Sequence, residues 1–73
     1  MMQITEEGQL NIGDKIKIVA KSDKNNYKSI TVKSIVDNGY GEEIIINKSR
    51  NYFFSIKGLV SGTSWAKEVY KLA

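Results

Sequence analysis

The chain has 73 residues and a formal net charge of +3 at pH 7, and it contains neither cysteine nor histidine. These features exclude disulfides, thiol nucleophiles, histidine general bases and the usual zinc-ligand sets. A domain of this size rarely gains more than about 3–5 kcal/mol of net stability from its core, so good packing, good turns or a partner must stabilise it.

The composition is that of a folded globular domain, with 41% hydrophobic and 26% charged residues. No long apolar run and no basic leader followed by an apolar stretch is present. The lack of cysteine fits a reducing compartment. We therefore expect one soluble domain over residues 1–73, with a polar lead-in at 1–11, located in the cytoplasm and without a membrane partner.

Alternation of polar and apolar residues predicts β-strands in the first part of the chain. Ile16 and Ile18 alternate with lysines, and the β-branched residues of the next segment also favour a strand. The predicted strands are Lys15–Ala20, Tyr27–Val36, Glu42–Asn47 and Asn51–Lys57, with polar loops at 21–26 and 48–50.

The dipeptide Asn-Gly at 38–39 predicts a hairpin, because both central positions of a type I′ turn need a positive φ. A plain two-residue loop would pair Lys33 with Ile44 and leave the apolar face inconsistent. We therefore predict an extra, bulged residue at Gly41. That register pairs Val32 with Ile46 and Ser34 with Ile44.

The segment 65–73, "WAKEVYKLA", supports two interpretations. The first is a strand, a short 3₁₀-like turn and a closing strand, after a turn at 61–64. The second is a C-terminal helix, because Trp65, Val69 and Leu72 have helical spacing. With the first, the chain forms five short strands in an antiparallel meander that closes into a small all-β barrel, which removes exposed edges.

The stretch "GDKIKIV" at 13–19, followed by a polar loop, hairpins and "GTSW" at 62–65, resembles an SH3-like barrel. The resemblance is to KOW-type domains and to small accessory proteins of tailed bacteriophages. It implies a binding module that acts on nucleic acid or on a host protein. The loop "KSDKNNYK" at 21–28 departs from the KOW pattern, because it lacks the central glycine.

Catalytic motifs are not found. The adjacent acids Glu6-Glu7 and Glu42-Glu43 are the only acidic pairs, and neighbours on a strand point to opposite faces. The glycines match neither a dinucleotide fingerprint nor a phosphate-binding loop. We therefore expect a non-enzyme with no catalytic residue, no cofactor and no metal.

Charge and aromatic residues suggest a partner-binding end. Alternate loops of a meander lie at the same end, so the loops at 21–26 and 47–51 should be neighbours, opposite acids at Asp14, Asp37, Glu42 and Glu43. The alternative is that these loops are merely hydrophilic. Basic residues beside aromatics suit single-stranded nucleic acid. The predicted partner-binding residues are Lys21, Lys24, Tyr27, Lys28, Lys48, Arg50, Phe53 and Lys57.

Phe53 is the aromatic residue expected at the surface, since it shares a strand face with Ser55 and Lys57. Exposed large aromatics usually mark contacts. The alternative is that Phe53 packs under the lead-in, where Ile4 and Leu10 need apolar neighbours. Tyr52, Phe54 and Trp65 are expected to fill the core.

Three functions are consistent with these features. The first is a phage-type accessory protein that binds a host protein or nucleoprotein complex, for example inhibiting a polymerase, a nuclease or a defence complex. The second is a nucleic-acid-binding barrel that uses its basic loop end. The third is a structural or assembly subunit that forms homo-oligomers through a strand edge.

Overall fold

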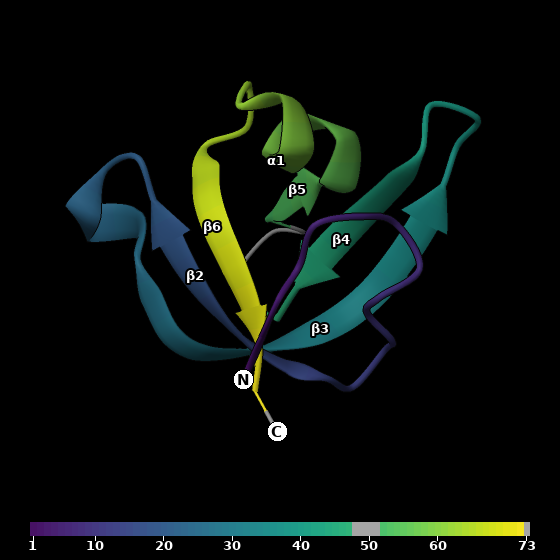
Figure 1. Cartoon of the computed structure of the whole chain (residues 1–73). Coiled ribbons are helices and arrows are strands. Elements are labelled where there is room, and N and C mark those ends of the chain that lie inside the picture. Colours follow the sequence, from purple (N-terminus) through teal and green to yellow (C-terminus); the bar gives the residue numbers. More distant parts are fainter. Residues whose placement is uncertain (48–51, 73) are drawn as a thin grey trace.

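The computed structural model describes residues 1–47 and 52–72, and its strands form one curled antiparallel sheet around a small core (Figure 1). The sheet order is β1-β6-β2-β3-β4-β5. This confirms an all-β, barrel-like fold, but with six strands instead of five. The elements are β1 (Met2–Gln3), β2 (Lys15–Ala20), the 3₁₀ turn η1 (Asp23–Asn25), β3 (Tyr27–Asp37), β4 (Glu42–Ile46), β5 (Phe53–Ser55), the helix α1 (Ile56–Ser61) and β6 (Ala66–Lys71).

The sheet is a meander only from β2 to β5. After α1 the chain crosses back, and β6 pairs antiparallel with β2, which places Val69 opposite Ile18. β1, from the predicted lead-in, then pairs with β6 and places Met2 opposite Lys71. In the part of the chain that the structure describes, β1 and β5 are the two edges of the sheet, so the barrel is half open.

A bulge bends β3 so that its first half pairs with β2 and its second half with β4. Val32 lies opposite Ile46 as predicted, but the register then shifts, and Ile35 instead of Ser34 lies opposite Ile44. The predicted bulge at Gly41 is therefore wrong. The extra residue is inserted at Lys33, in mid-strand, where it lets both Val32 and Ile35 face the core.

The hairpin loop consequently has four residues between the paired Asp37 and Glu42. Two side chains from the start of the loop shape it. Asp37 Oδ1 accepts a hydrogen bond from the Gly39 amide at 3.1 Å, and Asn38 Oδ1 accepts one from the Tyr40 amide at 3.1 Å. Such Asx turns close the loop without the predicted two-residue type I′ geometry.

The predicted fourth strand ends early, because the chain enters α1 at Ile56. Ser55 caps this helix, its Oγ accepting a hydrogen bond from the Gly58 amide at 3.0 Å. Gly62 ends it in the left-handed conformation, with φ of 83°. Segment 65–73 contains β6 as one strand up to Lys71, so neither the inserted 3₁₀ turn nor the C-terminal helix is present in its described part, up to Leu72.

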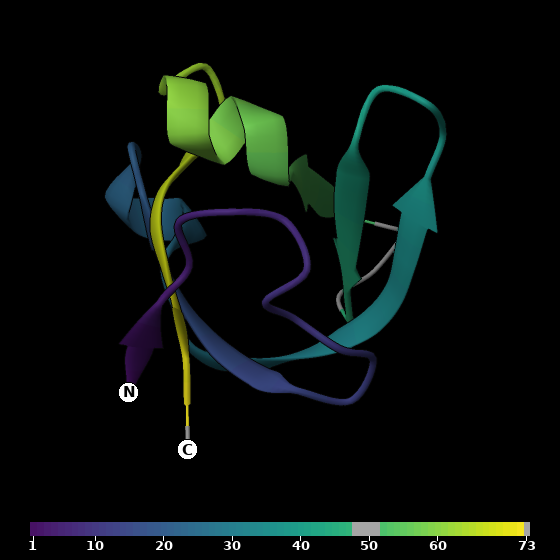
Figure 2. The ribbon, with the colours of Figure 1, turned by 45° about the vertical axis from the view of Figure 1, so that its right-hand side comes forward.

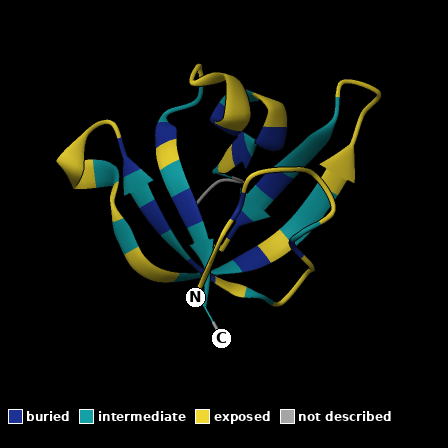
Figure 3. Ribbon diagram, in the orientation of Figure 1, coloured by how far each residue is buried: buried dark blue, intermediate teal, exposed yellow. Residues whose placement is uncertain are grey.

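The core lies inside the curl of the sheet, and the lead-in crosses the open side of the curl (Figures 2 and 3). Ile4 and Leu10 from the lead-in are buried there. Phe53 does not pack beneath them, since 48% of its surface is exposed. The largest fully buried side chains are Phe54, Ile16, Ile18, Ile44, Ile46, Ile56, Val32 and Val69.

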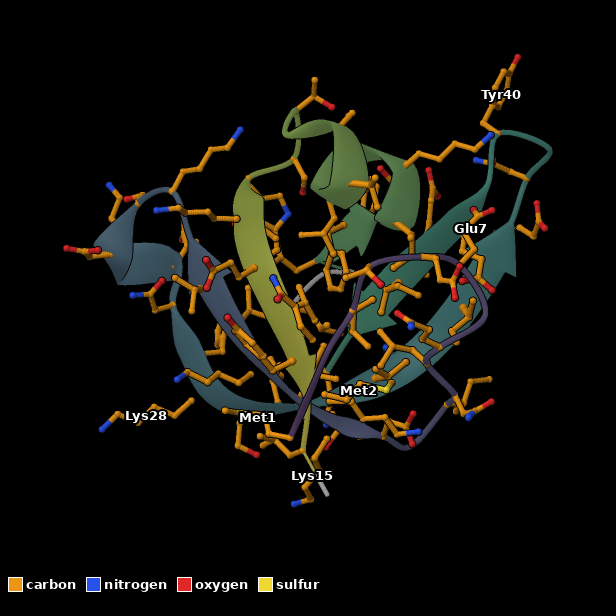
Figure 4. All side chains as sticks on the ribbon, viewed as in Figure 1. Met1, Met2, Glu7, Lys15, Lys28 and Tyr40 are labelled. Atoms are coloured by element: carbon orange, nitrogen blue, oxygen red, sulfur yellow. The ribbon has the colours of Figure 1, made fainter. Side chains whose placement is uncertain are left out.

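Two glutamates fasten the lead-in to the β3–β4 hairpin. Glu7 Oε2 accepts a hydrogen bond from the Glu42 amide at 2.6 Å, and Glu42 Oε1 accepts one from the Gly8 amide at 3.0 Å. Figure 4 shows Glu7 reaching the hairpin from the crossing loop. Glu7 also packs against Gly41, at which an added Cβ would lie 2.5 Å from Glu7 Oε2.

Among the described residues, no helix has the length and apolar character needed to cross a membrane.

Candidate partner-binding site

An aromatic cluster surrounds Trp65, which lies just before β6. Its ring centroid is 4.9 Å from that of Tyr52, 6.2 Å from Phe54 and 6.4 Å from Tyr27. The indole Nε1 donates a hydrogen bond to the Phe53 carbonyl oxygen at 2.7 Å, which satisfies the one polar atom of the ring. Phe54 is a core residue as expected, whereas Tyr52 and Trp65 are half-buried at the rim of the core.

A surface hollow of about 490 Å³ opens beside this cluster. β5 forms one wall, and the loop between α1 and β6 forms the other. Phe53 is its most exposed aromatic residue. Ser55, Thr63 and Ser64 also line it, so the hollow combines aromatic residues with small hydroxyl-bearing ones. Such a combination is typical of binding sites.

The open edge of β5 borders the hollow. The Ile46 amide donates to the Tyr52 carbonyl at 2.9 Å, and Ile44 lies opposite Phe54. Because hydrogen-bonded and non-hydrogen-bonded pairs alternate in an antiparallel ladder, the backbone groups of Phe53 and Ser55 point away from β4. Trp65 Nε1 already uses the Phe53 carbonyl. The amides of Phe53 and Ser55 therefore point toward the free edge of the sheet.

Lys21 lies at the rim of the same end of the molecule. Its backbone amide donates to the Trp65 carbonyl at 3.0 Å, and its Nζ contacts the Gly62 carbonyl. Lys24 is exposed in η1, and Tyr27 touches Trp65 edge-on. The structure thus brings Lys21, Lys24, Tyr27 and Phe53 to one end of the sheet.

Other predicted residues lie elsewhere. Lys28 points away from the core, on the outer side of β3 (Figure 4). Lys57 is on α1, and its side chain passes beside Gly41 of the hairpin. Lys48 and Arg50 fall outside the described residues, and with them the predicted contact between the two basic loops. The β3–β4 hairpin lies on the other side of the molecule from η1 (Figure 1).

The acidic end of the molecule gains one acid that the sequence did not indicate and lacks one that it did. Glu7 joins the predicted Glu42 there through the backbone contacts of the lead-in. Asp14 does not belong to it, because its Oδ2 is 3.3 Å from Lys71 Nζ and accepts a hydrogen bond from the Asn11 amide at 2.8 Å. No local pattern in the lead-in signals that it packs against a hairpin thirty-five residues further along the chain.

The hollow includes residues that the sequence did not single out, namely Ser55, Thr63 and Ser64. Ser55 is also the cap of α1, so the turn that starts the helix shapes the site. In the described ranges, no group of three or more acidic side chains is placed to hold a metal ion. Comparison of the chain with protein-family models, with curated proteins and with solved structures finds no match.

Proposed function

We propose that this protein is a small non-catalytic module that binds another protein at the hollow beside Trp65. The observation that carries the proposal is Phe53, which exposes 48% of its surface next to two half-buried aromatic rings. Aromatic residues in a pocket centre supply most of the binding energy of many interfaces. The adjacent open edge of β5 supports a partner segment that adds as an extended strand.

The arrangement of the rings supports a protein partner over stacked bases at this site. The centroids of Tyr52 and Trp65 lie 4.9 Å apart with their planes inclined by 36°, so each ring covers one face of the other and fewer free faces remain. Single-stranded nucleic acids need such free faces for stacking. An apolar side chain against Phe53, with backbone hydrogen bonds to β5, fits the hollow better.

The resemblance to small accessory proteins of tailed bacteriophages supports a role in modulating a host protein or nucleoprotein complex in the cytoplasm. On this proposal the hollow is the recognition site. The basic residues Lys21 and Lys24 at its rim then favour an acidic partner surface and accelerate its association.

The test is a pull-down from nuclease-treated lysate of the producing cell, with wild type compared with Phe53→Ser. The substitution removes an exposed ring and should leave the fold intact. We expect the captured protein to be lost with Phe53→Ser and retained with Tyr40→Ser, a matched control whose residue is 84% exposed at the hairpin tip. Figure 4 shows Tyr40 pointing away from the rest of the molecule.

Two outcomes would contradict the proposal. The first is an unchanged set of captured proteins with Phe53→Ser. The second is a concentration-dependent dimer, detected by light scattering, that only Phe53→Ser abolishes. That second result would assign the hollow to a second copy of the chain and favour the structural-subunit alternative.

A further inference from the structure

Lysines gather on the outer face of the sheet, which is turned away from the core. Ile16 and Ile18 of β2 are buried, so Lys15 and Lys17, which alternate with them, point outward. Figure 4 shows Lys15 and Lys28 extending away from the ribbon on this side. The lysines of this outer face are Lys15 and Lys17 on β2, Lys28 and Lys33 on β3, and Lys67 on β6.

Lys28 and Lys33 of β3 lie on the same face because β3 has two bulges, one where it pairs with β2 and one at Lys33 where it pairs with β4. Thr31 pairs with Lys15 and therefore also points outward, whereas Val32 is buried. The register shift between Ile16 and Ile18 leaves Lys28 exposed opposite Lys17. Lys33 is the bulged residue opposite β4 and is exposed as well.

Few acids offset this charge. Glu68 is the acid of β6 on the same face, where it lies opposite Val19. Its carboxylate accepts a hydrogen bond from the Tyr70 hydroxyl at 2.8 Å, and this bond is the main cause that raises the pKa of Tyr70. Lys17 Nζ lies 5.9 Å from the centre of the Tyr70 ring. Of the other acids, Asp14 precedes β2 and pairs with Lys71, Asp23 lies in η1, and the rest lie in the lead-in or at the hairpin. The net charge of +3 therefore conceals a basic face.

The lysines form a row along the β2–β3 pair. From Lys28 to Lys33 the strand rises by about 16 Å at about 3.3 Å per residue, and Lys17 and Lys15 fill the row from the neighbouring strand. The exposed or half-exposed hydroxyls of Ser29 and Thr31 lie between these charges. Lysines and hydroxyl groups along an extended track are typical of contacts to phosphate oxygens.

The same face lacks the features of other anionic partners. Of the exposed large apolar side chains among the described residues, only Val36 lies on β2 or β3, and it lies beyond Lys33 beside the hairpin. A surface that inserts into a membrane interface needs apolar residues among its cations. Protein interfaces are depleted in lysine at their centres. The chemistry therefore fits a phosphate backbone best.

We propose that the outer face of β2 and β3 binds the phosphate backbone of nucleic acid through Lys15, Lys17, Lys28 and Lys33, without reading base sequence. This site is separate from the hollow beside Trp65 and does not depend on it. A module with both surfaces holds its protein partner on nucleic acid.

The test measures binding of a fluorescently labelled duplex of arbitrary sequence by anisotropy between about 50 and 200 mM salt. Because each phosphate contact steepens the plot of log K against log salt by about 0.9, four lysines give a slope of about −3.6. The variant Lys28→Gln/Lys33→Gln should weaken binding on the order of a hundredfold at the lowest salt and flatten the slope by about 1.8.

The matched control is Lys24→Gln/Lys57→Gln, which makes the same change in net charge at two exposed lysines off this face. It should retain more affinity than the face variant and keep the wild-type slope. Phe53→Ser should bind the duplex as wild type does, which separates this site from the hollow. Equal losses in the two lysine variants, or no binding of duplex or single strand at the lowest salt, would overturn the proposal. So would lysine-dependent binding to phosphatidylserine vesicles with none to nucleic acid.

Discussion

Replacing Trp65 with alanine is expected to destabilise the domain by about 3 kcal/mol, near the lower end for removal of a large aromatic ring. The ring packs against Tyr27, Tyr52 and Phe54, and its Nε1 satisfies the Phe53 carbonyl. Its half-buried position keeps the cost below that of a fully buried residue. Because a domain of this size has only about 3–5 kcal/mol to lose, a large fraction of the variant should be unfolded at 25 °C.

Urea unfolding followed by far-UV circular dichroism measures this loss without the tryptophan signal. The matched variant Trp65→Phe keeps an aromatic ring but removes the indole donor, and it should cost about 1–2 kcal/mol. A Trp65→Ala variant with wild-type stability that had lost only its partner would show that Trp65 is a binding platform and not a packing residue.

Strand positions could be predicted from the sequence where alternation runs over several residues. The bounds of β2 agree with the prediction, and β3 and β4 differ from it by one residue at their ends. β1 could not be predicted, because two residues carry no periodicity. The six-residue α1 is also too short for a helical pattern, although the serine before it and the glycine after it are its capping signals.

The candidate site illustrates the same limit for contacts distant in sequence. The exposure of Phe53 followed from alternation within one strand, and the structure agrees. The hollow itself depends on the return of β6 to β2, which sets Trp65 beside β5. No local pattern encodes that crossing. The outer row of lysines likewise depends on two bulges in β3, whereas the sequence predicted one bulge, at Gly41.

Replacing Gly41 with alanine is expected to destabilise the fold by about 3 kcal/mol, whereas Gly39→Ala should cost about 1 kcal/mol. Both glycines lie in the hairpin loop with positive φ, 89° at Gly39 and 109° at Gly41, so both substitutions strain the backbone. Only at Gly41 would the new Cβ meet other atoms, 2.5 Å from Glu7 Oε2 and 3.1 Å from the Lys57 Cδ. The methyl group would displace the Glu7 carboxylate from the Glu42 amide, a bond to a charged group that is worth about 1.5–3 kcal/mol.

The two variants carry the same substitution at positions two residues apart in one loop, so the difference between them isolates the contact with the lead-in. Urea unfolding gives the two free energies, and hydrogen exchange locates the effect. The Glu42 and Gly8 amides should exchange faster in Gly41→Ala and keep their wild-type rates in Gly39→Ala, because only the first variant separates the lead-in from the hairpin. Equal costs for the two substitutions would mean that backbone strain alone determines the loss. Protected Glu42 and Gly8 amides in Gly41→Ala would likewise show that the glutamate pair does not fasten the lead-in, and that the burial of Ile4 and Leu10 is enough to hold it across the core.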